Sequence, residues 1–228
     1  MKHLIKTADS SSLAAVNYNR VILNTTTDNV TIDYSYVDLG LSVKWAKCNV
    51  GAEKETDAGL YFTWGETTGY TASQVGTDKQ FSWRDYKYGN SSSNLTKYNQ
   101  SDGKTVLESA DDAASQIMGS DWRMPTKAEF EELLSGTTNE WVTNYNGTGV
   151  NGRKFTSKTD TSKYIFIPAA GFCYDSSVSN VGGYGGVWSS SLDTSDPGNA
   201  WNLYFSSGGR NMGNLGRCYG RSVRGVRA

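Results

Sequence analysis

The C-terminal stretch, residues 182–228, constrains the fold more than any other part of the chain. It is dense in Gly, Ser, Asn and Arg and contains no Lys, Glu, Gln or His, although Lys and Glu are common earlier in the sequence. Such a composition also occurs in disordered tails. Here, however, Trp201, Leu203 and Phe205 alternate, and Val223 follows near the end, which is strand-like spacing. We therefore expect ordered strands joined by Gly-rich turns.

Side chains alternate across a β-strand, so this spacing assigns the residues of the stretch to two faces. Trp201, Leu203 and Phe205 fall together on an inward face, whereas Asn202 and Tyr204 face outward. Large apolar residues at such spacing are more often part of a core than of a binding site. The expected scaffold residues are Trp188, Trp201, Leu203, Phe205 and Met212.

The arginines of this stretch divide by position. Arg224 and Arg227 lie near the C-terminal strand, where we expect them to pair with nearby carboxylates or backbone carbonyls. Arg210 and Arg221 lie in Gly-rich turns. They are the better candidates for contacting a ligand, an anionic one in particular.

Length and charge limit the class of protein. The chain has 228 residues and fits one large domain or, as we favour, one domain with a small N-terminal appendage. Its net charge of -1 argues against a nucleic-acid partner, since such proteins collect a basic excess. No apolar run is long enough for membrane insertion, and the first residues lead into Thr, Ala, Asp and Ser instead of an export signal. An export signal that was removed before this sequence begins stays an open alternative.

The cysteines do not form a recognisable site. Cys48, Cys173 and Cys218 are too scattered for a disulfide framework, and none lies in a CxxC pair. We expect Cys48 and Cys173 to be buried, and Cys218, in the Gly-rich stretch, to be exposed.

The order of elements along the chain predicts an α+β fold. Residues 1–35 are expected to be an N-terminal arm or short β extension, with strands near 21–23 and 30–34. The main domain is expected to span 36–228 and to open with a strand over 36–46. A second strand is predicted over 164–168.

Between these strands lie a long irregular segment and two short helices. Residues 61–103 show little periodicity and should be held by their own aromatic side chains, among them Trp64, Trp83, Tyr86 and Tyr88. One helix is predicted over 111–118. The second, over 127–134, follows a capping box that Thr126 and Glu129 form.

Four separated motifs carry a resemblance to a known family. Residues 121–133 read DWRMPTKAEFEEL and resemble the RLPTEAEWE signature of the formylglycine-generating-enzyme branch of C-type lectin folds. With VDLGLSVKWA at 37–46, DAGLYFTWGE at 57–66 and WSSS at 188–191, the chain is similar to the Fibrobacter-type major paralogous domain of gut bacteria. The resemblance covers residues 36–228. It implies a C-type lectin fold of the formylglycine-generating-enzyme type, with two short helices, many short strands and long irregular loops.

Within that family, residues 182–228 resemble the variable region of diversity-generating retroelement target proteins. Those proteins display variable side chains on a C-type lectin scaffold. Randomised adenines turn an AAC codon into many residue types, but never into Lys, Glu, Gln, Met or Trp. Every outward residue expected here belongs to the permitted set, although Gly-rich turns also favour small polar residues for conformational reasons. The expected ligand-binding residues are Val187, Gly198, Asn199, Asn202, Tyr204, Ser207, Gly209, Arg210, Gly213, Leu215, Gly216, Cys218 and Arg221, with Tyr204, Arg210, Leu215 and Arg221 supplying most of the contact area.

The function that the resemblance implies is recognition of a receptor or host surface by a protein of a phage virion or bacterial cell surface. Its ligand would be a macromolecule or a glycan on a cell. Two other classes stay open: a carbohydrate-binding lectin and, less favoured, an oxidase like the formylglycine-generating enzymes.

Each of these classes lacks part of its usual signature here. The oxidases use a cysteine pair, whereas Cys218 stands alone near the C-terminus, and the only histidine, His3, lies far from it in the sequence. The second calcium motif of C-type lectins needs a carboxylate that Asn202 and its neighbours do not offer. Asp111 and Asp112 are expected to be helix caps instead of an acid and base pair. We therefore expect no catalytic residue, no metal ligand and no cofactor.

Overall fold

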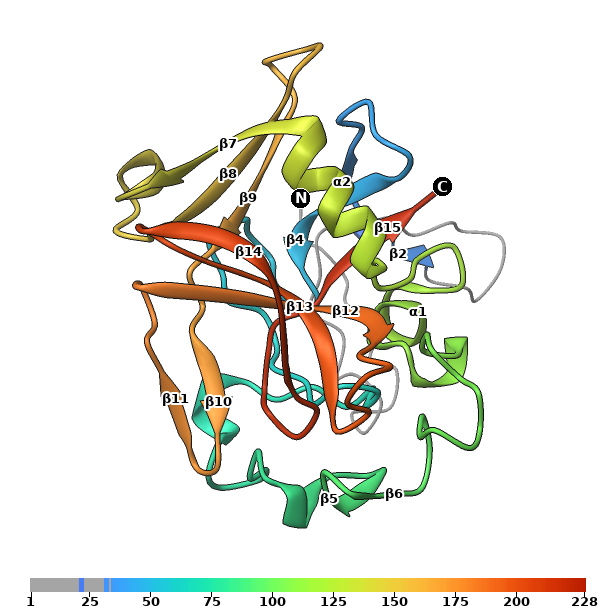
Figure 1. Ribbon diagram of the computed structural model, residues 1–228. Helices are drawn as coiled ribbons and strands as arrows, with labels where there is room; N and C mark the ends of the chain where they lie inside the picture. Colours follow the sequence, from blue (N-terminus) through green and yellow to red (C-terminus); the bar gives the residue numbers. More distant parts are fainter. Residues whose placement is uncertain (1–20, 23–30, 33) are drawn as a thin grey trace.

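A computed structural model of the chain describes residues 21–22, 31–32 and 34–228 (Figure 1). Two short α-helices and many short antiparallel strands in this part of the chain confirm the α+β class. The expectation for His3 lies outside the described residues. The helices are α1 (Ala113–Met118) and α2 (Lys127–Gly136), with 3-10 turns η1 (Ala72–Gln74), η2 (Trp83–Asp85), η3 (Ser109–Asp111) and η4 (Tyr145–Gly147). The strands are β1 (Val21–Ile22), β2 (Thr31–Ile32), β3 (Tyr36–Val37), β4 (Lys44–Asn49), β5 (Gly89–Ser91), β6 (Asn94–Leu95), β7 (Thr137–Val142), β8 (Gly152–Ser157), β9 (Tyr164–Pro168), β10 (Phe172–Tyr174), β11 (Ser177–Ser179), β12 (Tyr184–Leu192), β13 (Asn199–Ser206), β14 (Gly209–Gly216) and β15 (Arg224–Arg227).

Three antiparallel sheets of three strands form the framework of the described residues. Their strand orders are β12-β13-β14, β15-β4-β3 and β7-β8-β9, and the remaining strands pair as β1-β2, β5-β6 and β10-β11. The last strand, β15, pairs with β4, so the end of the tail is tied to the start of the predicted domain. The C-terminal stretch is therefore ordered, as its strand-like spacing predicts.

The N-terminal elements agree only in part with expectation. The two short strands expected before residue 36 are present as β1 and β2. The single strand predicted over 36–46 is wrong, because the chain turns between β3 and β4. There Gly40 adopts a φ of +75°, and the Asp38 carboxylate accepts a hydrogen bond from the Gly40 N–H at 2.9 Å. The boundary at residue 36 stays a prediction, although Tyr34, on its N-terminal side, packs edge-on against Trp122.

Both helices begin at side-chain caps. The Thr126 hydroxyl accepts from the Glu129 N–H at 3.2 Å, and the Glu129 carboxylate accepts from the Thr126 N–H at 2.8 Å, which confirms the predicted capping box. Helix α2 continues past the predicted end, as far as Gly136. Asp112 caps α1 by accepting from the Ser115 N–H at 2.9 Å. This helix begins later than predicted because Asp111 belongs to the preceding η3 turn.

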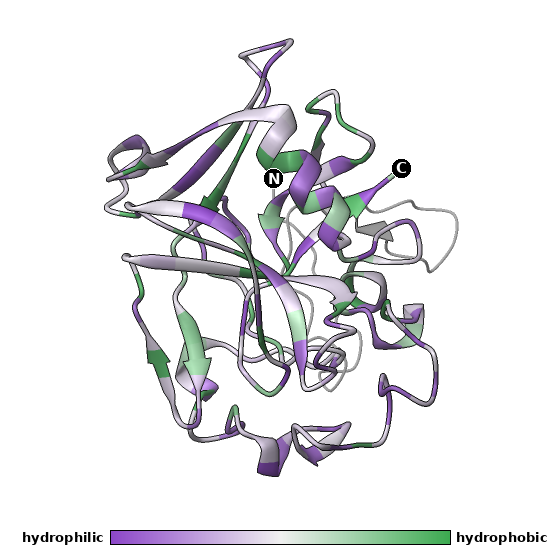
Figure 2. Cartoon of the chain, in the orientation of Figure 1, coloured by the Kyte–Doolittle hydropathy of each residue, from purple (hydrophilic) through white to green (hydrophobic). Residues whose placement is uncertain are grey.

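Two large apolar clusters make up most of the core. One contains Trp64, Trp122 and Trp188. The other contains Phe130 of α2 and lies between the β7-β8-β9 sheet, α2 and the C-terminal strands (Figure 1). Trp122 and Phe130 are both buried as expected, but in different clusters. Hydrophilic and hydrophobic residues both occur along α2 (Figure 2), since only one side of it packs inward.

The irregular segment after β4 is held by aromatic side chains, as predicted. Trp64, Tyr86 and Tyr88 are buried, and Trp83 stands edge-on against Tyr86 with 5.4 Å between ring centroids. Arg217 from the tail adds a contact that the sequence did not suggest. Its guanidinium lies 4.9 Å from the Trp64 ring centroid and donates to the Tyr86 hydroxyl at 2.8 Å. The tail and this segment therefore stabilise each other.

Candidate functional site

One face of the β12-β13-β14 sheet is part of the core. Residues paired in register share a face, which places Leu203 with Met212 on β13 and β14. Leu203 and Phe205 are fully buried in the cluster that includes Phe130 of α2. Trp201 and Met212 are half-buried at the margin of this face. The predicted inward face is therefore confirmed, and Trp188 is fully buried as well.

The opposite face reaches solvent at one end. Tyr204 on β13 stacks on Tyr184 of β12 with 6.1 Å between ring centroids and 9° between ring planes. On the other side of Tyr204, Gly213 lies beneath its ring, where an added Cβ would come within 2.9 Å of a ring carbon. A larger residue at position 213 would therefore displace Tyr204. Toward the other end of the same face, Ala200 is buried and Leu215 packs against the core.

The predicted ligand-binding residues are not equally accessible. Ser207 is exposed at the β13–β14 turn, and Arg210, expected in a Gly-rich turn, is exposed at the start of β14. The half-exposed residues are Asn199, Tyr204, Gly209, Gly213, Leu215 and Gly216. The expectation of solvent-facing positions is wrong for the buried residues Val187, Gly198, Asn202, Cys218 and Arg221.

Strand pairing explains two of these corrections. Val187 pairs with Leu203, so it shares the inward face of the sheet. Asn202 lies between two neighbouring strands, and its amide donates to the Gly213 carbonyl at 3.0 Å. Alternation along β13 alone could not reveal this burial, because the outward face is itself covered at that end.

Close packing against distant segments explains two more. Gly198 lies against Ser92, where an added Cβ would approach to 2.7 Å. Cys218 follows Arg217, whose side chain is fully buried among aromatic rings. Burial raises the pKa of the Cys218 thiol to about 11. Cys218 is therefore a packed, protonated thiol instead of an exposed contact residue.

Arg221 is buried beneath aromatic rings. Its guanidinium carbon lies 5.1 Å from the Phe172 ring centroid and 5.0 Å from that of Tyr184. It occupies the space over Gly186, where an added Cβ would come within 2.3 Å of Nη1. Its Nε and Nη1 have no hydrogen-bond partner among the described residues, and desolvation lowers its pKa. The Arg221 guanidinium therefore packs against the Phe172 and Tyr184 rings and is not accessible to solvent.

These rings belong to a continuous group that sequence reasoning missed. Tyr174 stacks on Tyr219 at 4.8 Å, Tyr219 lies 6.5 Å from Phe172, and Phe172 meets Tyr184 edge-on at 6.1 Å. With Tyr204 they form what we call the aromatic row. Its sequence signal is the alternation of Phe172 and Tyr174 around buried Cys173, which puts both rings on one side of β10.

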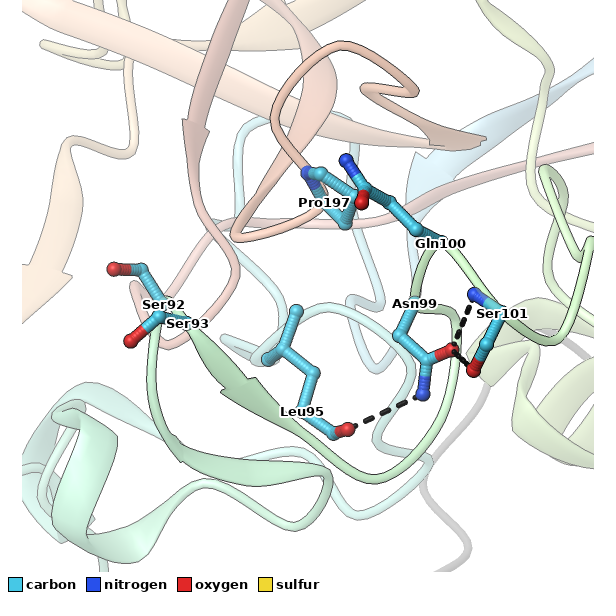
Figure 3. A pocket seen from close by; sticks show the side chains of 7 residues that line it. All are labelled: Ser92, Ser93, Leu95, Asn99, Gln100, Ser101 and Pro197. Carbon is cyan, nitrogen blue, oxygen red and sulfur yellow. Dashed lines mark hydrogen bonds between the residues drawn. The ribbon is translucent and has the colours of Figure 1, made fainter.

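Two of the cavities beside the tail adjoin predicted ligand-binding residues. The first, of about 470 Å³, lies between the segment carrying β6 and the loop before β13, next to Gly198 (Figure 3). The side chain of Asn99 is already engaged there with the Leu95 carbonyl and with Ser101. The lining residues of this cavity are Ser92, Ser93, Leu95, Asn99, Gln100, Ser101 and Pro197.

The second cavity, of about 520 Å³, lies at the Tyr174 end of the aromatic row. We call it the tyrosine cavity. It combines aromatic rings with charged and uncharged polar side chains, whereas no aromatic ring lines the first cavity. Its lining residues are Gln80, Ser82, Trp83, Arg84, Tyr174, Asp175, Cys218 and Tyr219.

The groups considered for catalysis have structural partners. Asp112 is the α1 cap, and its pKa is raised by burial. Although burial opposes ionisation of Asp111, hydrogen bonds from Lys97, Tyr88 and Tyr98 lower its pKa to about 2. The expectation that Asp112 is a cap is confirmed, whereas Asp111 is a partner of the Lys97 ammonium and not a cap.

Two further searches within the described residues give negative results. No group of three or more His, Cys, Asp or Glu side chains in this part of the chain lies close enough together to hold a metal ion. Its helices are all too short or too polar to cross a bilayer.

Comparison of the chain with models of protein families, with curated proteins and with solved structures gives no match.

Proposed function

We propose that this chain is a ligand-binding protein that recognises a macromolecule or glycan on a cell surface through its C-terminal face. The scaffold is a C-type lectin fold of the formylglycine-generating-enzyme type, and residues 182–228 are a region diversified by a retroelement. The protein is displayed on a phage virion or on a bacterial cell surface. One observation carries the proposal: within the tail, a fully buried framework adjoins exposed positions whose residue types the diversification mechanism permits.

The accessible positions have suitable chemistry for binding. Tyr204 offers a rigid ring with a polar tip, Arg210 an exposed guanidinium and Leu215 a half-exposed apolar side chain. Tyr and Arg are enriched among residues that dominate binding energy. Their replacement would alter recognition without disturbing Leu203 and Phe205, which hold the sheet in place. Ser207 and Asn199 extend the same surface.

The oxidase alternative is disfavoured by the state of the cysteines. All three cysteines are buried, and none is part of a disulfide. Burial raises the pKa of Cys173 to about 12 and that of Cys218 to about 11, so both thiols stay protonated at neutral pH. A thiolate is the form that binds metals and attacks substrates.

The carbohydrate-binding alternative has a specific feature in its favour, the tyrosine cavity, although no group of three or more His, Cys, Asp or Glu side chains among the described residues could hold a calcium ion. Carbohydrate binding is compatible with recognition of a cell surface, since a receptor on that surface can carry a glycan.

The DNA beside the gene tests the proposal. A reverse-transcriptase gene and an imperfect second copy of the sequence encoding residues 182–228 are expected close by. In that copy, adenines should stand at the codons of exposed positions such as Tyr204 and Arg210. A locus with neither feature would remove the basis for a diversified face.

A further inference from the structure

Aromatic rings from three separate parts of the chain line the tyrosine cavity. Tyr174 and Tyr219 stack with 22° between their planes, and Tyr174 remains 52% exposed. The half-buried Trp83 belongs to η2 and lines the same cavity. An exposed ring face gains free energy when it covers the apolar face of a ligand, and its negative quadrupole attracts polarised C–H groups.

Polar groups of the same cavity are available for a ligand. The Ser82 hydroxyl, the Trp83 indole N–H and the Asp175 carboxylate make no hydrogen bond with another side chain or backbone group among the described residues. The hydroxyls of Tyr174 and Tyr219 are likewise unpaired within that part of the chain. The ring-lined hollow therefore offers both hydrogen-bond donors and acceptors.

The backbone around the cavity is already fixed in position. Cys173 and Gly220 exchange two hydrogen bonds of 2.9 Å, which joins β10 to the turn carrying Tyr219. Phe81 and Asp175 exchange two more, of 2.8 and 3.0 Å, which joins the same hairpin to the segment before Trp83. A ligand therefore meets rings and polar groups that need little ordering, which lowers the entropic cost of binding.

We propose that the tyrosine cavity binds a neutral saccharide residue. The C–H face of a pyranose ring packs on Tyr174, and the sugar hydroxyls donate to the Asp175 carboxylate and accept from the Trp83 indole N–H. The cavity volume of about 520 Å³ lies within the range of ligand pockets, about 300–1,000 Å³. This inference goes beyond the proposed function, because it assigns a ligand class to residues that lie, Cys218 apart, outside the positions proposed to vary.

The charges of the cavity favour a neutral ligand over other classes. The lining carries one positive and one negative side chain, Arg84 and Asp175, and Arg84 also pairs with Asp85 at 3.8 Å, so the lining has no excess positive charge that would select an anion. A wholly apolar ligand would strip water from several unpaired polar groups without replacing those hydrogen bonds. A ring with an apolar face and hydroxyls at its edge satisfies both kinds of group. The cavity in Figure 3 lacks the aromatic part of this combination.

The test is titration of the purified protein with galactose, mannose, N-acetylglucosamine, fucose, lactose and chitobiose, followed by calorimetry and saturation-transfer NMR. EDTA is present throughout, so that calcium cannot bridge ligand and protein. At least one of these sugars should bind with a dissociation constant of about 1 mM or tighter. Tyr174→Ala should weaken that binding about tenfold or more, since it removes the ring surface.

Two further variants make the result specific. Asp175→Asn keeps the size of the side chain and suits the left-handed backbone at this position, where φ is 52°. It should also weaken binding, because an amide accepts sugar hydroxyls less strongly than a carboxylate. Tyr36→Ala removes another tyrosine of similar exposure, 45%, outside this cavity and should leave binding unchanged.

Absence of binding by every sugar of the panel overturns the proposal, and so does binding that Tyr174→Ala and Asp175→Asn leave unaltered. Thermal melting of each variant confirms that the fold is retained. Neither negative result touches the proposed diversified face, whose test is the gene locus. A locus without a reverse transcriptase would, in turn, leave the saccharide site standing.

Discussion

At the scale of single residues, the tail's arginines have different roles. Arg224 is fully buried and donates to the Asn49 side chain at 3.0 Å, to the Ala46 and Phe166 carbonyls at 2.9 Å each, and to the Lys47 carbonyl. The expectation that it pairs with local groups is confirmed. Arg210, in contrast, is exposed at the start of β14, where it is accessible to the proposed ligand.

Replacing Arg224 by Met tests this difference. The change keeps most of the volume but leaves the acceptors around it, buried oxygens such as that of Phe166, without a donor. The free energy of unfolding should fall by about 3 kcal/mol or more, measured by urea denaturation. Arg227→Met is the matched control: Arg227 is half-buried beside the Tyr36 and Trp122 rings, but its ion pair is with the exposed Asp121, so the expected loss is about 1 kcal/mol. Equal losses in the two variants would contradict the assigned role of Arg224.

The cysteines give a second prediction at this scale. Burial raises the pKa of Cys173 to about 12 and of Cys218 to about 11, from an ordinary value of 9.0. The folded protein should therefore react very slowly with a thiol reagent near neutral pH and should leave a substrate-peptide cysteine unoxidised, with or without copper. In denaturant, Cys48, Cys173 and Cys218 should all react. Oxidase turnover that disappears in Cys218→Ser would contradict the non-enzymatic proposal.

The same shifts set the sign of a pH effect. The unfolded chain loses these thiol protons first, because its pKa values are the lower ones. The stabilisation is complete below pH 9 and is lost as the pH rises toward 11. Urea midpoints should accordingly fall with alkaline pH, and less so in a Cys173→Ala, Cys218→Ala double variant.

At the scale of elements, the capping box of α2 is a local device with a measurable effect. Thr126→Ala removes the acceptor for the Glu129 N–H and should lower the free energy of unfolding by about 1 kcal/mol. Thr161→Ala, at an exposed position without a side-chain hydrogen bond among the described residues, should have little effect. Ligand binding should be the same in both variants. An unchanged melting temperature in Thr126→Ala would contradict the cap assignment.

Elements that depend on neighbours in sequence were predictable from it. The Thr126–Glu129 capping box and the apolar run of β9 (Tyr164–Pro168) are determined by residues close together in the sequence, and both occur where expected. The break between β3 and β4 was missed because a strand-like pattern hides the turn at Gly40. The aromatic row was missed for another reason: Tyr174 and Tyr219 meet only when β10 pairs with the turn after β14.

At the scale of the whole molecule, the proposed binding surface depends on contacts between distant segments. Alternation along β13 correctly places Leu203 and Phe205 inward. It cannot show that Cys218 is buried next to Arg217, or that Phe172 and Tyr184 cover Arg221. The predicted face is therefore smaller than the sequence suggests. It centres on Tyr204 and the exposed β13–β14 turn and continues along the aromatic row to the tyrosine cavity.

Sequencing the 3′ end of the gene from many members of one population tests the central claim most directly. Variation should be concentrated at codons of accessible positions, such as Tyr204, Ser207, Arg210 and Leu215, and should exclude Lys, Glu, Gln, Met and Trp there. The codons of Leu203 and Phe205 should be constant, because these residues are fully buried. Variation spread evenly along the chain, or concentrated at those two buried positions, would contradict a diversified binding face.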